Sequence, residues 1–236
     1  MTQHAAPAVV LLSGGLDSTT VLAVARKDGY STSTLAFDYG QKNRYELECA
    51  AEIARRFTAA NHRQLVIDLR VFGGSSLTSD RPVERGRKVE EIGQAIPSTY
   101  VPVRNTLFLT YALAWAEVLE ATDIFIGVNA IDTSGYPDCR PEFIAAYTRL
   151  ANLATKLSTE LGRQIRIHTP LQELNKAQII RLGLGLGVDY GLTSTCYDPL
   201  PGGAPCRSCD ACILRARGFA EVGVADPLLA KFGFAS

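Results

Sequence analysis

A glycine pair separates an apolar run from a helix-like stretch near the start of the chain. Residues 9–20 read Val-Val-Leu-Leu-Ser-Gly-Gly-Leu-Asp-Ser-Thr-Thr. Glycines let backbone N–H groups approach a ligand closely, and the amino-terminal end of a helix favours an anion. The serine hydroxyls add further donors. We therefore predict a polyphosphate site, with contacts from Leu12, Ser13, Gly14, Gly15, Leu16, Asp17, Ser18, Thr19 and Thr20.

No lysine follows these glycines, so the segment differs from the loop that grips the β- and γ-phosphates for γ-phosphoryl transfer. Asp17 is expected to help hold the Mg²⁺ that accompanies the phosphates, because this cation favours a carboxylate beside phosphate oxygens. We treat Asp17 and Ser18 as catalytic candidates. The alternative interpretation is an ordinary strand-to-helix turn in which Asp17 or Ser18 caps the helix.

Four of the six cysteines have the spacing of metal ligands. Cys196, Cys206, Cys209 and Cys212 form a C-x9-C-x2-C-x2-C pattern in a segment rich in proline and glycine. Two-residue gaps let successive thiolates converge on one ion, and four sulfurs complete a tetrahedral Zn²⁺ shell, so we predict a structural zinc site. A redox dithiol and an iron–sulfur cluster are the competing interpretations. Cys49 is interpreted as an inert core thiol.

The bulk composition limits the classes of protein to which the chain could belong. The 236 residues are 47% hydrophobic and carry 24 basic and 24 acidic side chains, so no net charge draws the molecule to nucleic acid or to an anionic membrane. The sequence has no run of 18 apolar residues. We therefore expect a cytoplasmic protein without a membrane segment. The reducing cytoplasm would keep its cysteines as free thiols.

Apolar runs of strand length alternate with amphipathic stretches along the first 186 residues. The predicted strands are 8–12, 32–39, 64–69, 123–129 and 165–169, and the predicted helices are 18–27, 44–57, 105–119, 141–161 and 176–186. This alternation predicts a parallel five-stranded α/β sheet with helices on both faces and ligands at the carboxyl ends of the strands. Residues 70–104 are expected to form a long loop or lid. We assign 1–190 to the nucleotide-binding domain and 191–236 to a zinc-binding extension with a short helix over 210–219.

Several segments together resemble one enzyme family. They are SGGLDS at 13–18, GVNAIDTSGYPDCRPEF at 127–143, HTPLQELNKAQII at 168–180 and the cysteine segment with its CRSCDAC core. The chain resembles the QueC family of 7-cyano-7-deazaguanine synthases, in the ATP pyrophosphatase superfamily, whose fold is adenine nucleotide alpha-hydrolase-like. One departure is Val103, where that family commonly carries glycine or another small residue.

The resemblance implies that the chain uses ATP and ammonia to convert 7-carboxy-7-deazaguanine to the nitrile through an amide, as a homodimer. Phe37 is then a candidate for contact with adenosine, as is Tyr39, although both could be core aromatics. Arg104 and Arg140 are candidates for binding the substrate carboxylate or the α-phosphate. Candidates for binding the guanine-like ring are Asp132, Tyr136, Asp138, Arg140 and Glu142. Lys176 is either a phosphate-site residue or a solvated surface lysine.

Two other functions remain open at this point. An ATP-dependent tRNA thiolation enzyme would use a similar loop, but it needs a persulfide-carrying cysteine and a basic surface, which the even charge balance does not favour. A zinc-bearing protein that binds ATP without turnover is the alternative outside the enzymes.

Overall fold

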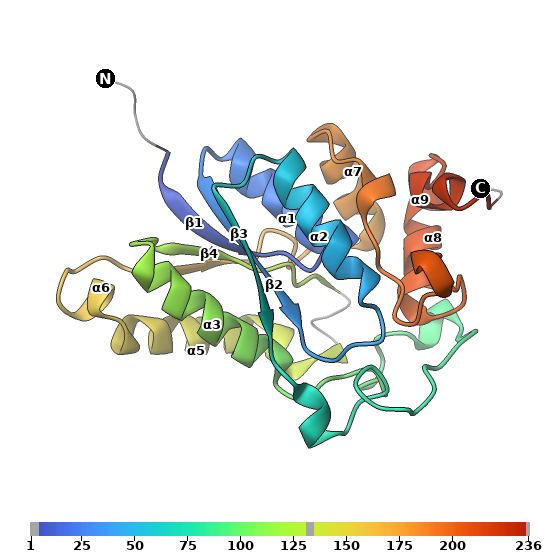
Figure 1. Cartoon of the computed structure of the whole chain (residues 1–236), viewed down its shortest axis with the longest axis horizontal. Coiled ribbons are helices and arrows are strands. Elements are labelled where there is room, and N and C mark those ends of the chain that lie inside the picture. The colour runs from blue at the N-terminus through green and yellow to red at the C-terminus, as the bar shows by residue number, and fades with distance from the viewer. Residues whose placement is uncertain (1–4, 131–134, 235–236) are drawn as a thin grey trace.

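The computed structural model describes residues 5–130 and 135–234 and confirms a parallel five-stranded sheet (Figure 1). The strand order is β3-β2-β1-β4-β5. The strands are β1 (Pro7–Leu11), β2 (Ser31–Asp38), β3 (Asn61–Val66), β4 (Asp123–Phe125) and β5 (Arg166–His168). The chain therefore builds outward from β1 in one direction and then returns to build in the other. The crevice between β1 and β4 is the topological switch point, where folds of this kind bind their ligands.

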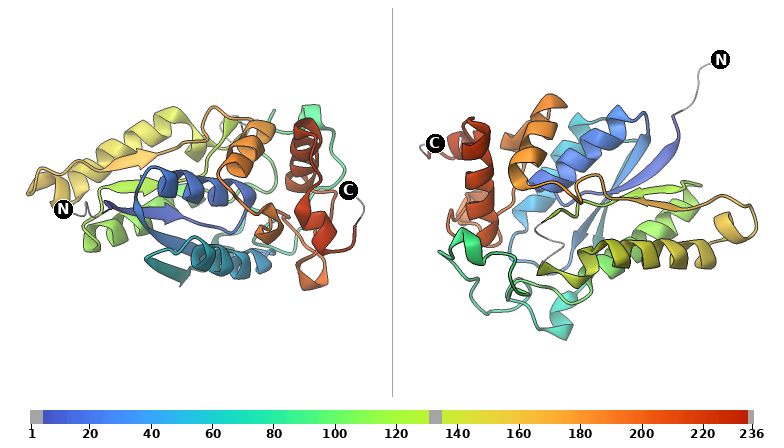
Figure 2. Two further views of the ribbon diagram at one scale, coloured as in Figure 1. Left: turned by 90° about the horizontal axis from the view of Figure 1, so that it is seen from above. Right: turned by 180° about the vertical axis from the view of Figure 1, so that it is seen from behind.

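Helices cover both faces of the sheet, as Figures 1 and 2 show. One face packs against α1 (Leu16–Lys27), α2 (Tyr45–Arg56) and α7 (Lys176–Gly185), and the other against α3 (Arg104–Val118), α5 (Pro141–Ala154) and α6 (Lys156–Thr159). Alternate residues of β1 pack into different cores. Val10 packs on the face covered by α1, α2 and α7, and Val9 and Leu11 pack on the face covered by α3, α5 and α6. Burial on both faces explains why β1 is a nearly continuous apolar run. Strand β2 is equally buried, although its first four residues are serine and threonine.

The ends of several elements differ from the prediction. The third strand is Asn61–Val66, three residues earlier than predicted. It lies at the edge of the sheet and is largely exposed, so it contains polar residues and cannot be recognised as an apolar run. The prediction of a single helix over 141–161 is wrong, because Thr155 has extended backbone angles and separates α5 from α6. The predicted short helix is α8 (Asp210–Val222), and α9 (Pro227–Lys231), which follows it, was not predicted.

The segment after β3 lies beside the cysteine-rich segment, far along the chain. Residues 73–103, which we call the 73–103 loop, contain only a short 3₁₀ turn at Val89–Glu91 among the described elements, as the predicted long loop requires. Three contacts join it to the cysteine-rich segment: an Arg85–Asp198 ion pair of 2.8 Å, an Arg87–Asp210 ion pair of 3.0 Å, and a Gly86 N–H donated to the Ser208 carbonyl at 2.7 Å. Figure 2 shows the two segments together at one end of the molecule.

A buried carboxylate joins the two short strands β4 and β5. The Asp123 carboxylate accepts two hydrogen bonds of 2.8 Å from the Arg166 guanidinium and lies 2.6 Å from Nε2 of His168. Burial alone would raise the pKa of Asp123, but the hydrogen bonds from His168, Arg166 and Thr122 outweigh it and hold that pKa below its ordinary value. The charged form of Asp123 therefore stabilises the folded state.

Replacing Asp123 with asparagine is expected to make the free energy of unfolding less dependent on pH below about pH 4. A depressed folded-state pKa contributes stability that is present above the unfolded-state pKa of about 4 and is lost as the pH falls further. Denaturant unfolding at pH 7 should show Asp123→Asn about 2–3 kcal/mol less stable than the wild type. The difference should shrink between pH 4 and pH 2. Asp80→Asn, at an exposed position, is the control. If the unfolding free energies of Asp123→Asn and the wild type fell equally between pH 4 and pH 2, the stabilising role of the Asp123 charge would be contradicted.

Candidate active site

The glycine pair forms a tight cradle between β1 and α1. Gly14 has φ +87°, and a Cβ atom on it would lie 2.1 Å from the Glu46 carbonyl oxygen of α2, so only glycine fits. The hydroxyls of Ser13 and Ser18 are 3.0 Å apart, and the Ser13 N–H donates to Ser18 Oγ at 3.2 Å. Helix α1 begins directly afterwards. Hydroxyls and the amino-terminal end of a helix thus meet at the switch point, as an anion site requires.

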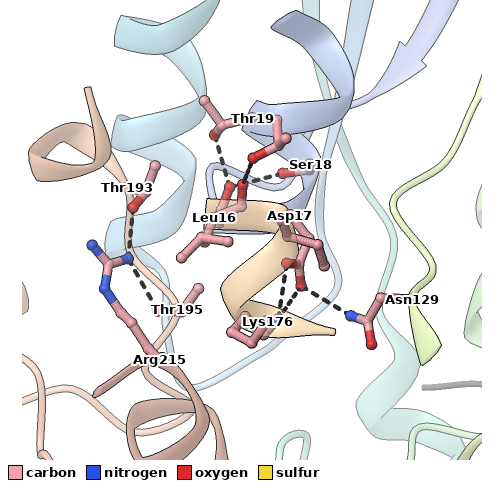
Figure 3. A network of polar contacts seen from close by, with 12 residues as sticks. Leu16, Asp17, Ser18, Thr19, Asn129, Lys176, Thr193, Thr195 and Arg215 are labelled. Atoms are coloured by element: carbon pink, nitrogen blue, oxygen red, sulfur yellow. Dashed lines mark hydrogen bonds and ion pairs between the residues drawn. The ribbon is translucent and has the colours of Figure 1, made fainter. Parts of the chain in front are cut away.

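An ion pair closes one side of this cradle. Lys176 Nζ donates to both carboxylate oxygens of Asp17, at 2.7 and 2.8 Å, and Asn129 Nδ2 donates to Asp17 at 3.2 Å (Figure 3). Lys176 begins α7, whose amino-terminal end is fixed by a capping box between Asn175 and Gln178. The Lys176 side chain is only 15% exposed, so it is not a solvated surface lysine. Three chain segments therefore place one carboxylate, one ammonium group and one amide at the cradle.

The cradle opens into a cavity of about 260 Å³. Many of the predicted site residues line this cavity: Leu12, Ser13, Gly15, Leu16, Asp17, Ser18, Phe37, Arg104 and Tyr136. Phe37 also belongs to the core and stacks on Phe108 with ring centroids 4.0 Å apart. The two interpretations of Phe37, as core aromatic and as cavity wall, are therefore compatible.

The remaining predicted residues lie outside the cavity wall or outside the described residues. Thr19 donates to the Gly15 carbonyl at 2.7 Å and Thr20 to the Leu16 carbonyl at 2.9 Å, so both hydroxyls brace the loop. Asp138 is buried and accepts the N–H of Asn105 at the start of α3, at 2.9 Å. The others are Gly14, which packs against α2, the exposed Arg140 and Glu142, and Asp132, which lies outside the described residues. Direct ligand contacts from these residues stay predictions.

The structure adds polar groups to the wall that the sequence did not reveal. They are Gln41, Asn43, Glu46, Ser194 and Arg215. Gln41 follows β2, and its position just after a predicted strand was a usable signal. Buried Arg215 pairs with Asp226 at 2.6 and 2.8 Å. It also donates to Thr193 Oγ1 at 2.7 Å (Figure 3). Ser194 and Arg215 lie just outside the two ends of the cysteine motif, which gives no sign that they face the cavity.

The wall contains a carboxyl group whose protonation is perturbed. Burial raises the pKa of Glu46 to about 7, against the opposing effects of a hydrogen bond from Gln41 and of the Arg104 charge. Arg104 itself begins α3, donates to the Tyr39 hydroxyl at 3.2 Å and lies over the Tyr39 ring. A carboxyl and a guanidinium group thus face the same cavity from α2 and α3.

The four predicted cysteine ligands come together beside the cavity. The sulfur atoms of Cys196, Cys206, Cys209 and Cys212 all lie within 4.8 Å of one another. A tetrahedral zinc–thiolate site with bonds of about 2.3 Å places its sulfurs about 3.8 Å apart, so the cluster can hold one metal ion. Backbone N–H groups already donate to three of these sulfurs, at 3.3 to 3.5 Å. Cys196 also lines the cavity, so a bound ion would support the wall.

The fifth and sixth cysteines lie outside this cluster. Cys49 is buried in α2, and burial raises its pKa to about 11, which fits the predicted inert core thiol. Cys139 is buried between α3 and α5 and accepts a hydrogen bond from Asn105 Nδ2 at 3.1 Å. Neither residue belongs to the metal cluster.

The departure at Val103 has a structural consequence. Val103 adopts φ +50° and ψ +26° directly before α3, in the left-handed region that β-branched residues rarely occupy. Its side chain is 54% exposed, so little burial offsets the strain.

Replacing Val103 with glycine is therefore expected to stabilise the fold. A left-handed residue with a Cβ atom costs about 1–2 kcal/mol, and the extra entropy of unfolded glycine offsets part of that gain. The expected net gain is about 1 kcal/mol, or a melting temperature about 2–4 °C higher. Val103→Ala, which retains the Cβ atom, should melt close to the wild type. A lower melting temperature for Val103→Gly than for the wild type would contradict the inference that the backbone of Val103 is strained.

No helix within the described ranges 5–130 and 135–234 is both long and apolar enough to cross a membrane.

Fold and site together define the class of protein. A parallel sheet with a glycine-paired turn leading into a helix at its switch point is an ATP-binding fold of the ATP pyrophosphatase, or PP-loop, type. The chain belongs to the QueC family, because the family model described as "Queuosine biosynthesis protein QueC" matches residues 7–223.

Similar proteins match over almost the whole chain. A 7-cyano-7-deazaguanine synthase from Desulfatibacillum aliphaticivorans is 58% identical over 220 residues, which cover 93% of this chain and 94% of the relative. A 7-cyano-7-deazaguanine synthase from Syntrophotalea carbinolica is 59% identical over the same shares. Among solved structures, NMN synthetase from Francisella tularensis is similar with a TM-score of 0.47 and 18% identity, covering 99% of this chain and 79% of the other.

Proposed function

We propose that this protein converts 7-carboxy-7-deazaguanine and ammonia to 7-cyano-7-deazaguanine, with ATP cleaved to AMP and pyrophosphate. The observation that carries the proposal is the identity of 58–59% over more than nine-tenths of the chain to synthases of this nitrile. The geometry agrees, since the cavity joins the proposed phosphate cradle to a wall with three further charged side chains, Glu46, Arg104 and Arg215. The reaction places the protein among ATP-dependent carbon–nitrogen ligases.

The chemistry explains why one nucleotide site serves two steps. An oxygen of the substrate carboxylate attacks the α-phosphorus of ATP and expels pyrophosphate. Ammonia then attacks the acyl carbon, forming the amide and releasing AMP. The amide oxygen attacks a second ATP in the same way, and loss of AMP with two N–H protons leaves the nitrile. We therefore expect two AMP and two pyrophosphate for each nitrile formed.

The residues of the cradle have clear roles in this scheme. The phosphates bind the backbone of Gly15 and the hydroxyls of Ser13 and Ser18, and the adenosine lies along Phe37. Asp17 is suited to hold a Mg²⁺ ion, which would neutralise charge on the leaving pyrophosphate. Lys176 would contact the same phosphates, because an ammonium group already lies at the cradle.

The substrate carboxylate would bind near Arg104, whose planar guanidinium suits both a carboxylate and the α-phosphate. Tyr136 also lines the cavity and would stack on the deazaguanine ring. Asp132, Asp138, Arg140 and Glu142 remain proposed substrate residues. Of these, Asp138, Arg140 and Glu142 lie outside the cavity wall and would need to move to reach the ring.

The four cysteines would hold a structural Zn²⁺ ion. No coordination position would remain open, so the ion would stabilise the 191–236 extension against the 1–190 domain and take no part in the reaction. We further propose a homodimer in the cytoplasm that acts on small molecules and not on nucleic acid.

A single incubation tests the proposed reaction. The purified protein is mixed with ATP, Mg²⁺, ammonium and 7-carboxy-7-deazaguanine, and mass spectrometry follows the acid, the amide and the nitrile. Loss of the acid with two AMP for each nitrile is the expected result. Formation of ADP and orthophosphate in place of AMP and pyrophosphate would overturn the proposal.

The two alternative functions are outcomes of the same experiment. A tRNA thiolation enzyme would leave the acid unchanged and bind tRNA in moderate salt. A protein that only binds ATP would release neither AMP nor pyrophosphate. The family to which the chain belongs favours neither alternative.

A further inference from the structure

Five charged side chains line the cavity, and three of them are already paired. Asp17 pairs with Lys176 at 2.7 Å, and Arg215 pairs with Asp226 at 2.6 Å. Glu46 and Arg104 are the other two. Within the described residues, neither has an oppositely charged partner within 4 Å. Apart from the Asp17–Lys176 pair, which we propose to act on the phosphates and their cation, the cavity therefore offers one unpaired carboxyl group and one unpaired guanidinium group to a ligand.

Glu46 is held in place by a chain of hydrogen bonds from the end of β2. Gln41 accepts the N–H of Tyr39 at 2.7 Å and donates to the Phe37 carbonyl at 2.9 Å and to Glu46 Oε1 at 3.0 Å. The Glu46 N–H donates to Asn43 Oδ1 at 3.2 Å. No described residue donates to Glu46 Oε2, so this oxygen is available to a bound molecule.

The proposed substrate has the donors that such a carboxylate recognises. A 7-deazaguanine ring carries N1–H and a 2-amino group side by side on one edge, and its 7-carboxylate lies on the opposite side of the ring system. A carboxylate has about four acceptor sites on its two oxygens, so Glu46 can accept from two adjacent donors through Oε2 and the second lone pair of Oε1 while Gln41 keeps its bond. A guanidinium group pairs with a carboxylate. The two unpaired charges of the cavity are therefore complementary to the two ends of this molecule.

We propose that Glu46 is the residue that reads the N1–H and 2-amino edge of the substrate, with Arg104 facing the carboxylate end. This inference rests on the proposed function. It also selects among the acidic residues, since Asp138 is bonded to Asn105 and Glu142 is exposed outside the cavity wall. Glu46 is thus the described carboxylate that both lines the cavity and has a free oxygen.

The test compares the acid with its analogue lacking the 2-amino group, 7-carboxy-7-deazahypoxanthine. The wild type should prefer the amino-bearing acid by about 100-fold in kcat/KM, because the analogue leaves a buried acceptor unsatisfied. In Glu46→Ala this preference should fall to about threefold or less, while KM for ATP stays within about threefold. Glu46→Gln, which keeps one acceptor, should give an intermediate preference. Glu48→Ala, an exposed position on the same helix, is the matched control and should keep the full preference.

Two results would overturn the assignment. The first is an unchanged preference in Glu46→Ala. The second is a tenfold rise in KM for ATP with the preference kept, which would place Glu46 at the nucleotide. If the wild type turns over neither compound, the proposed function fails. Calorimetric binding of the acid and of the analogue to wild type and Glu46→Gln then tests Glu46 independently, and equal binding of both compounds to the wild type would refute it.

Discussion

Asp17→Asn is expected to lower the formation of AMP and pyrophosphate about 1,000-fold while the protein stays folded. Asp17 is the carboxylate of the phosphate cradle, and its charge is the group suited to hold the cation that neutralises the leaving pyrophosphate. Losing such a contribution removes several kcal/mol of transition-state stabilisation, and about 4 kcal/mol corresponds to this factor. Release of labelled pyrophosphate in the presence of the acid and ammonium measures the effect.

The control for this variant lies at the other end of the same helix. Asp28 is exposed at the carboxyl-terminal end of α1, so Asp28→Asn changes the same charge away from the cradle and should retain full activity. Asp17→Asn leaves Lys176 without its ion pair, and thermal unfolding shows whether the fold survives that loss. A folded Asp17→Asn protein that turns over within tenfold of the wild type would refute the role of the carboxylate.

Cys209→Ser is expected to abolish metal binding and to destabilise the carboxyl-terminal part of the chain. Cys209 lies at the start of α8, and its sulfur accepts the N–H of Tyr197, a residue of the cavity wall. Structural zinc contributes on the order of 10 kcal/mol in small zinc domains, so several kcal/mol of unfolding free energy should be lost here. Metal analysis of the wild type should give one zinc per chain, and the variant less than about a tenth.

Cys49→Ala is the matched control, because Cys49 is a buried thiol outside the cluster. This variant should retain its zinc and lose no more than about 1 kcal/mol, since only one sulfur atom is removed from the core. Full zinc content in Cys209→Ser would contradict the four-sulfur site. Iron in the purified wild type would replace the zinc assignment with a cluster.

The 73–103 loop contacts the cysteine-rich segment and also lines the cavity. Arg85 and Arg87 of this loop pair with Asp198 and Asp210, which flank the cysteines. Thr99 of the same loop and Cys196 both line the cavity. Loss of the metal should therefore also loosen the loop, and limited proteolysis of Cys209→Ser should cut within 73–103 faster than in the wild type.

The parallel sheet, the glycine turn after β1 and the cluster of four cysteines could all be predicted from the amino-acid sequence. Each of these depends on residues that are close together in the chain or on a strong periodic pattern. Strand β1 is apolar on both faces, Gly14 has a positive φ in the turn after it, and three of the four clustered cysteines fall within seven residues. Local geometry and burial dictate such features, so a linear pattern is enough to find them.

Which other polar groups line the cavity follows from the three-dimensional fold and not from any local pattern. In the sequence, nothing distinguishes Glu46 from the other acidic residues of α2, or Arg215 from the other arginine of α8. The fold pairs Arg215 with Asp226, leaves Glu46 with a free oxygen in the cavity wall and ties Asp138 to the start of α3. Whether a charge is free or already paired depends on neighbours far along the chain, because the parallel crossovers bring distant segments to the same edge of the sheet. No local pattern records those neighbours.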